Sequence, residues 1–511
     1  MVCPAQLAGR LYTSSLDSRG SLSNWRVCDS IDVRHLIREA GAMERTTLNE
    51  VIADLRSLGL SSGTDARLPK GTRPPAGMLD CWARTAALAE PDARQAAIWA
   101  IREAAHAAGV VPASVQGLYA ARGAGAWSDR TVPALNLRGW SYQTCRAAFR
   151  AAGKIGAHLI IFEQAVGEAI YAAQAPSEYT AAVLAAAMRE GYTGPVFLQA
   201  DHDQVNAKSY LKDPKAEIQR LTDVIQTQIA ANFFNIDIDA STVVDLSLPT
   251  VVDQQRLNAE LTARFTRLVR ELEPPGVTIS VGAEIGEVGH HNTTPEELRA
   301  FMATYPQALT VGGPAAVGAS KVSVNSGTYH GGKVLRDGSL APIDVGFDTL
   351  RTLSRVCRDE YGLAGVVQHG ASTLPKEQLS KFPETGTVEI HLALGFNNLI
   401  FDHPRLPQTV KDEITAYVFA HHASERAPGE TDAQLIYNTR KKAWAGMKER
   451  FWNLPADIQQ DIMASLEEMF RDMFMRMNVG DTAALVARHT VAKVVPVPLP
   501  AALARMLTRA A

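Results

Sequence analysis

The stretch Val196-Phe197-Leu198-Gln199-Ala200-Asp201-His202-Asp203-Gln204 decides the fold. It follows Gly194-Pro195 and changes abruptly from apolar residues to Asp-His-Asp. An apolar run of this length between turn residues predicts a buried strand. In α/β barrels the reactive groups follow the carboxyl ends of such strands. The stretch therefore predicts either a barrel strand ending at a reactive site or a plain strand entering a polar loop.

The same order of strand, loop and helix recurs along the chain, which favours the first interpretation. Eight strands are expected, at residues 132–137, 157–162, 195–200, 233–238, 277–283, 321–325, 366–368 and 399–401. Helix-like apolar spacing follows most of them. Eight strands alternating with helices predict an α/β protein built on a parallel (β/α)8 TIM barrel rather than an open sheet.

Helical segments are expected on both sides of the barrel. The predicted division is a helical N-terminal extension at 1–125, a TIM-barrel catalytic domain at 126–403 and a helical C-terminal extension at 404–511. Long amphipathic helices are predicted over 409–424, 433–452 and 456–477. The middle one is basic, which predicts a solvated face, with a subunit interface or a contact to a substrate phosphate as alternatives. Its basic residues are Arg440, Lys441, Lys442, Lys448 and Arg450.

Composition excludes several classes of protein. The chain is 46% hydrophobic and 21% charged, as in an ordinary globular protein, and its formal net charge of −3 indicates no nucleic-acid or membrane surface. Its 5 cysteines are scattered without a CxxC pair, so no disulfide framework or thiolate zinc site is predicted. The first residues lack the pattern of a signal peptide, and no apolar run is long enough to span a membrane. A cytoplasmic protein is expected.

Acidic and imidazole groups follow several of the predicted strands. If the barrel closes, these groups converge on one face. A single histidine is best interpreted as an ordinary buried or surface residue, but three histidines at strand ends with carboxylates nearby favour zinc or a similar divalent ion. The groups are Asp201, His202, Asp237, Asp239, Glu284, His330 and His369. The neighbouring Asp203 is expected to cap or solvate the following loop.

Small residues follow two of these histidines, in Gly331-Gly332-Lys333 and Gly370-Ala371-Ser372-Thr373. Small residues let backbone N–H groups approach an anion, and the loops after the late strands of a barrel often bind phosphate. A glycine in a loop is by itself no more than a turn signal. Beside presumed ligands, the two loops predict phosphate binding.

Together these segments resemble the class II, metal-dependent fructose-bisphosphate aldolases and their tagatose-bisphosphate relatives. The resemblance covers residues 131–403 and rests on motifs that are weak singly but fairly specific in this order. The motifs are Thr-Val-Pro-Ala-Leu-Asn136, Ala-Asp201-His202, Ile-Asp239-Ala-Ser, Ala-Glu284-Ile-Gly, Thr-Tyr-His330-Gly and Gln-His369-Gly-Ala-Ser.

The resemblance implies a role for each matched residue. Asp201 would be the acid/base on the cleaved hydroxyl. The metal ligands would be His202, His330 and His369, with Glu284 and Asp239 as remote or alternative ligands. The substrate and its phosphate would be bound by Gly331, Lys333, Gly370, Ser372, Asn136 and Asn398, with Asn397 and Asp402 as alternatives to Asn398.

The implied cofactor is Zn²⁺ or another divalent metal, with a second metal or a monovalent cation as a further option. The implied reaction makes or breaks a C–C bond in a ketose phosphate of carbohydrate metabolism, as in glycolysis, through a metal-stabilised enediolate that contains a dihydroxyacetone-phosphate-like unit. The family also implies a homodimer as the expected oligomer.

Some segments depart from the family pattern. Gln164-Ala165 stands in place of a substrate serine, and the segment from Gly395 to Asp402 does not reproduce the usual phosphate motif of the last strand. These departures concern the substrate more than the metal. Two alternatives therefore stay open: a metal-dependent sugar-phosphate epimerase or isomerase on the same barrel, and a non-catalytic partner subunit of an aldolase.

Overall fold

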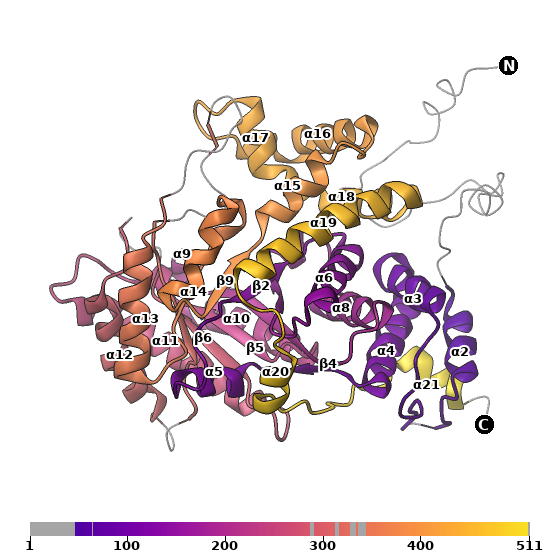
Figure 1. Cartoon of the computed structure of the whole chain (residues 1–511), viewed down its shortest axis with the longest axis horizontal. Coiled ribbons are helices and arrows are strands. Elements are labelled where there is room, and N and C mark those ends of the chain that lie inside the picture. The colour runs from indigo at the N-terminus through magenta and orange to yellow at the C-terminus, as the bar shows by residue number, and fades with distance from the viewer. Residues whose placement is uncertain are drawn as a thin grey trace. The chain divides into compact units, whose positions relative to one another are not determined.

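Eight parallel strands close into a barrel in the computed structural model of the chain (Figure 1), as predicted. The structure describes residues 46–63, 65–286, 291–311, 316–327, 334–335 and 344–508. The strands pair in the order β2-β3-β4-β5-β6-β7-β8-β9, and β9 pairs back with β2. They are β2 (Val132–Asn136), β3 (Ile161–Ala165), β4 (Gly194–Gln204), β5 (Asn235–Asp239), β6 (Ser280–Glu284), β7 (Lys321–Ser323), β8 (Val366–Gln368) and β9 (Glu389–Leu392).

Seven of the eight strands lie where the sequence predicted them, within a few residues, but the predicted eighth strand is wrong. Residues 399–401 belong to the helix α15 (Leu394–Asp402), and the last strand is β9, which precedes that helix. In β9 and the residue before it, the apolar residues Val388, Ile390 and Leu392 alternate with Glu389 and His391. Alternation of this kind is the signature of a strand with two different faces, whereas the prediction followed a continuous apolar run.

Helices connect the strands and surround the barrel. Side chains at the helix starts satisfy free backbone N–H groups: Asp213 caps α10 (Pro214–Ala230), and Thr294 and Glu297 form a capping box at α12 (Pro295–Leu309). The helices between β2 and β9 are α6 (Ser141–Ile155), α7 (Val166–Tyr171), α8 (Pro176–Arg189), α9 (Ala207–Lys212), α10 (Pro214–Ala230), α11 (Val251–Leu272), α12 (Pro295–Leu309), α13 (Phe347–Tyr361) and α14 (Lys381–Thr385).

From residue 46 to the start of the barrel, the described residues form helices and one strand. These elements are α2 (Leu48–Ser57), α3 (Ala76–Leu88), α4 (Pro91–Ala108), β1 (Val110–Ala113) and α5 (Gln116–Gly123). Strand β1 pairs with the first half of β4, which adds a strand that the sequence prediction lacked. Leu118 and Tyr119 of α5 pack with Phe197 and Val367 in one buried cluster, so α5 covers the amino-terminal end of the barrel.

After the barrel the described chain is helical except for connecting segments. The predicted helix over 433–452 is interrupted by the 3-10 turn η7 (Arg440–Ala443), and α19 packs along α6 (Figure 1). None of the described helices is both long and apolar enough to cross a membrane. The domain division of 1–125, 126–403 and 404–511 stays a prediction. The helices are α15, α16 (Gln408–His422), α17 (Asp432–Thr439), α18 (Trp444–Trp452), α19 (Ala456–Arg476), α20 (Ala483–His489) and α21 (Ala501–Thr508).

Candidate active site

A bulge at the end of β4 turns two consecutive side chains toward the same end of the barrel. The pairing of β4 with β5 shifts register between Ala200 and Asp203, where β4 holds one extra residue. His202, inside the bulge, has a φ of 51°, in the left-handed region that few non-glycine residues adopt. In a regular strand Asp201 and His202 would face opposite sides. The bulge instead brings both side chains to the site, as bulges beside active sites commonly do.

Asp203 occupies the other side of the strand, and the prediction that it caps or solvates the loop is wrong. Its side chain is fully buried, and Oδ1 accepts a hydrogen bond from Gln228 Nε2 on α10 at 2.8 Å. Burial raises the pKa of Asp203 to about 7, although the bond from Gln228 opposes this. Asp203 therefore joins β4 to its covering helix and takes no part in the site.

The ends of three further strands, β5, β6 and β8, meet around His202. Its Nδ1 lies 3.6 Å from Asp239 Oδ2 and 3.6 Å from Glu284 Oε2, and its Nε2 lies 3.6 Å from Asp201 Oδ1. The ring of His369, which follows β8, lies 4.1 Å from that of His202, centroid to centroid. The structure thus brings together Asp201, His202, Asp239, Glu284 and His369, all predicted from the sequence.

The carboxylates set the electrostatics of this cluster. Burial alone would raise the pKa of Asp201, but His202 and His391 outweigh burial and hold it well below its usual range. Burial alone would lower the pKa of His202, whereas Asp201 and Asp239 raise it well above the ordinary value. A histidine must lose its proton to bind a metal. Metal binding at His202 is therefore expected to strengthen as the pH rises.

The donor set fits a divalent metal ion. Asp201, His202, His369 and His391 each offer one ligand atom, and these atoms lie within 4.8 Å of one another. Imidazole nitrogen and carboxylate oxygen suit Zn²⁺ and related divalent ions. Glu284 adds a carboxylate, with Oε2 lying 3.9 Å from His369 Nδ1. The predicted ligand His330 lies outside the described residues, as do Gly331 and Lys333.

His391 is a site residue that the sequence prediction missed. It lies on β9, and its side chain is 3% exposed. Its Nδ1 donates to Asp201 Oδ1 at 3.0 Å, and its Nε2 donates to Glu389 Oε1 at 2.7 Å. Burial lowers the pKa of His391, but Glu163 and Asp201 raise it well above the ordinary value, which makes it a donor at both nitrogens. The alternation along 387–392 was the signal that could have found it.

Below this site the barrel interior holds buried charges instead of the apolar layers usual in such barrels. Lys321 Nζ donates to Glu389 Oε1 at 2.5 Å and to Gln199 Oε1 at 2.8 Å, and lies 2.9 Å from Asp237 Oδ2. Gln199 Nε2 in turn donates to Glu163 Oε2 at 2.9 Å. We call Lys321, Asp237, Glu163, Glu389 and Gln199 the interior ion cluster.

Gly282 on β6 makes room for the interior ion cluster. A Cβ at this position would lie 2.3 Å from Asp237 Oδ1 and 2.8 Å from Lys321 Cε. Such contacts are too short for any side chain, so glycine is required for the ion pair to form. His391 joins the cluster to Asp201, because its ring bonds to Glu389 on one side and to Asp201 on the other.

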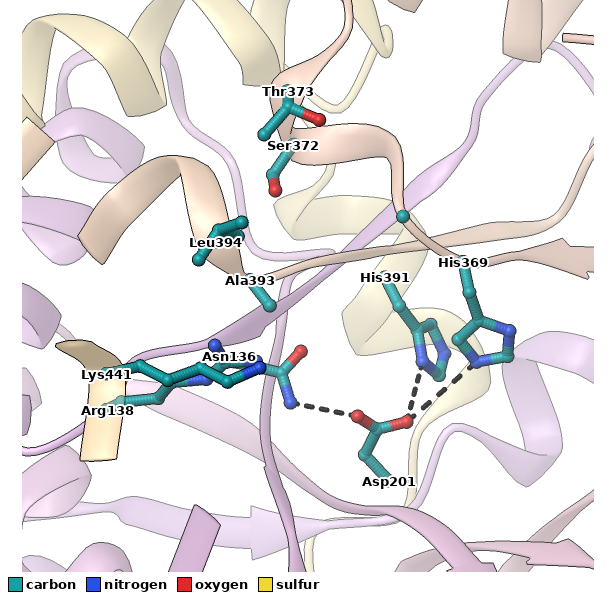
Figure 2. Close-up of a pocket in the computed structure, with 11 residues that line it drawn as sticks. Asn136, Arg138, Asp201, His369, Ser372, Thr373, His391, Ala393, Leu394 and Lys441 are labelled. Carbon is teal, nitrogen blue, oxygen red and sulfur yellow. Dashed lines mark hydrogen bonds and ion pairs between the residues drawn. The ribbon is translucent and has the colours of Figure 1, made fainter. Parts of the chain in front are cut away.

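A cavity of about 120 Å³ opens above these residues (Figure 2). Asn136, Gly370 and Ser372, all predicted to face the substrate, line it. Asn136 Nδ2 donates to Asp201 Oδ2 at 2.9 Å. The other lining residues are Arg138, Asp201, His369, Thr373, His391, Ala393, Leu394 and Lys441.

The predicted substrate residue Asn398 does not line this cavity. Its side chain donates to Tyr437 Oη at 2.8 Å and accepts from Arg440 Nη2 at 2.7 Å, so it ties α15 to the following helices. Its assignment to the substrate depended on a last strand at 399–401, which is wrong. Because β9 ends earlier, His391 occupies the strand position that faces the site.

With the geometry established, comparison with known proteins identifies the family. The family model described as "Fructose-bisphosphate aldolase class-II" matches residues 126–441. The chain belongs to this family. No curated protein sequence matches this class II aldolase family member at a significant level.

Several solved structures resemble this aldolase-family chain. A probable tagatose 6 phosphate kinase from Sinorhizobium meliloti is 16% identical, with 74% of this chain and 98% of that chain covered and a TM-score of 0.46. A fructose-bisphosphate aldolase from Campylobacter jejuni is 16% identical, with 73% and 96% covered and a TM-score of 0.42. A fructuronate-tagaturonate epimerase from Cohnella laeviribosi is 11% identical, with 74% and 86% covered and a TM-score of 0.49.

Proposed function

We propose that this chain is a divalent-metal-dependent lyase that cleaves or forms a C–C bond in a ketose phosphate. The observation that carries the proposal is the placement of Asp201 between a histidine–carboxylate cluster and the cavity. His202 and His369, with Glu284 and Asp239 nearby, would hold the metal; by the family resemblance His330 would join them. When bound, the metal supplies Lewis-acid polarisation of the substrate carbonyl.

Asp201 is suited to be the general base. Its carboxylate lines the cavity. Because its pKa lies well below the usual range, the group is ionised and free of a proton before the reaction. In the cleavage direction Asp201 would take the proton of the substrate hydroxyl. The C–O bond of that carbon then becomes a carbonyl, the neighbouring C–C bond breaks, and its electron pair passes to the carbonyl group of the other fragment.

Asn136 and His391 would orient this base. Asn136 Nδ2 bonds to one oxygen of Asp201, and His391 Nδ1 bonds to the other, so the carboxylate is held from two sides. Both ring nitrogens of His391 donate to carboxylates. For this reason we assign His391 to orienting Asp201 and not to holding the metal.

The test measures products from a panel of ketose monophosphates and bisphosphates with the metal-loaded protein. We expect a three-carbon phosphate from at least one ketose. Failure to form any three-carbon fragment would refute the lyase proposal, and conversion to an epimer without cleavage would favour the alternative, an epimerase. A purified protein that holds no divalent metal after loading would favour the alternative of a non-catalytic partner subunit.

Two variants separate the roles of base and ligand. Asp201→Asn is expected to keep the metal and lose about 10²- to 10⁴-fold in turnover, because general-base catalysis contributes on that order. His369→Ala is expected to lose the metal itself. Metal analysis of both purified variants checks this, and equal metal loss in both would show that the roles are assigned wrongly. Location in the cytoplasm and a homodimer stay predictions.

A further inference from the structure

The cavity has a cationic side formed by two chain segments far apart in sequence. Arg138 follows β2, and Lys441 belongs to η7 in the predicted C-terminal extension. In Figure 2 both lie on one side of Asn136 and Asp201, and the two histidines lie on the other side. A ligand that reaches from the histidines to Arg138 and Lys441 would therefore span the cavity.

Most of the basic residues around η7 are paired with carboxylates. Arg440 binds Asp402 at 2.6 Å, Lys442 pairs with Glu425, Lys448 binds Glu178 at 2.6 Å and Arg450 binds Glu413 at 3.0 Å. Within the part of the chain that the structure describes, Lys441 makes no hydrogen bond or ion pair. The predicted solvated face is thus wrong for Lys441, which lines the cavity, and for Lys448, which is buried.

The charge of Arg138 is already balanced, which leaves Lys441 as a surplus cation. Arg138 Nε binds Glu168 Oε1 at 2.5 Å, and Glu168 is itself held by Asn136 Nδ2 at 3.1 Å. Burial lowers the pKa of Lys441, and so does Arg138, although Glu168 partly opposes them; the ammonium is therefore partly desolvated beside a like charge. An anion bound between the two cations would relieve this repulsion.

The position of Lys441 is maintained by its neighbours. Trp444 packs directly against Gly139, whose missing side chain leaves space for the indole ring: a Cβ there would lie 2.2 Å from the ring. Gly139 follows Arg138, so this contact joins the start of α18, directly after η7, to the loop that carries the other cation. Arg440 anchors the same turn to α15 through Asp402. Lys441 is therefore presented to the cavity by a packed segment.

From these contacts we infer that Lys441 and Arg138 form a subsite for the anionic group of the substrate, at the end of the cavity away from the histidines. The inference rests on the proposed function and adds a residue from the region after the barrel to the site. A phosphate or a carboxylate has the required charge, and Lys441 would contribute a charge-assisted hydrogen bond to it. Through this contact Lys441 would select ketoses that carry an anionic group at that end.

The test measures anion binding by calorimetry in the metal-loaded full-length chain, with inorganic phosphate and gluconate as probes. Lys441→Met is expected to raise the dissociation constant of at least one probe tenfold or more. The variant loses the hydrogen bond between the ammonium and the anion, and such charged hydrogen bonds are stronger than those between neutral groups. Lys441→Arg, which keeps the charge, should recover most of the affinity. The control Lys442→Met removes a neighbouring lysine that pairs with Glu425 and should change binding less than twofold.

The probe whose binding depends on Lys441 identifies the anion. Weaker binding of phosphate or of gluconate to Lys441→Met, without the same loss in the control Lys442→Met, supports the subsite. The subsite would be overturned if each probe bound Lys441→Met as tightly as it binds the wild type. It would also be overturned if neither probe bound the wild type. Metal content and far-UV circular dichroism of each variant show whether the fold and the metal site are intact. Because the assay needs no turnover, failure of C–C cleavage would refute the lyase and leave this result standing.

Discussion

Lys321→Met tests whether the interior ion cluster stabilises the barrel. The ammonium of Lys321 is 1% exposed, and Glu389, to which it donates, is 0% exposed. Methionine keeps most of the side-chain volume but removes the charge. Glu389 and Asp237 would then be buried without their shared cation, in an environment where an unpaired charge is strongly disfavoured.

The magnitude follows from the pKa of Glu389. Burial alone would raise the pKa of Glu389, but the opposing effect of Lys321 and His391 is larger. The pKa of Glu389 therefore falls from 4.5 to about 2. At 1.36 kcal/mol per pH unit, this difference corresponds to ~3 kcal/mol in favour of the ionised carboxylate. Removing one partner of a buried ion pair costs about 3–5 kcal/mol. Lys321→Met is therefore expected to lower the free energy of unfolding by about 3–5 kcal/mol.

Urea unfolding at pH 7.5, followed by circular dichroism, measures this loss. The control is Lys442→Met, whose partly exposed pair with Glu425 is expected to contribute at most about 1 kcal/mol. In a double variant, Glu389→Gln should recover part of the loss, because it removes one of the two buried carboxylates that lose Lys321 as their partner and keep only His391 nearby. A loss below about 1 kcal/mol in Lys321→Met, or strict additivity in the double variant, would refute the reasoning.

Three further predictions concern pH, packing and metal. Burial and the nearby Arg102 lower the pKa of His106 to about 4. The stability that the neutral imidazole contributes above pH 6.5 should therefore be lost as the pH falls toward 4, by up to ~3 kcal/mol. Urea unfolding at pH 4.5 and 7.5 should show a smaller loss of stability in His106→Gln than in the wild type. Gly139→Ala, which drives a Cβ into Trp444, should cost about 1–3 kcal/mol, whereas Gly153→Ala, in open space on α6, should not destabilise the protein. Chelator should abolish activity and Zn²⁺, Co²⁺ or Mn²⁺ restore it; activity in excess chelator would point to a lysine Schiff base instead.

Much of the barrel could be predicted because its strands have local signatures. Apolar runs between turn residues located seven strands, and the polar residues after them were the groups that meet in the cluster: Asp201, His202, Asp239, Glu284 and His369. This works because the carboxyl ends of parallel strands lie at one end of a barrel whatever the loops do.

The eighth strand could not be located by apolar content, since half of its side chains are charged or polar. Glu389 and His391 face a barrel interior that contains Lys321 and Asp237, and their charges are acceptable only because these partners are there. A local pattern cannot show such compensation, because the partners are distant in sequence. The misplaced last strand at 399–401 explains both errors: it put Asn398 at the substrate and left His391 out of the site.

The sequence by itself determined the barrel, its family and most of the residues at the strand ends, because periodicity and turn residues act over a few neighbours. The tertiary structure alone decided three things. The bulge with the left-handed His202 turns Asp201 and His202 to one side and Asp203 to the other. Packing of Trp444 against Gly139 brings Lys441 to the cavity across about three hundred residues of sequence. His391, paired with Glu389, donates a hydrogen bond to Asp201. Each depends on contacts between segments that only the closed fold places side by side.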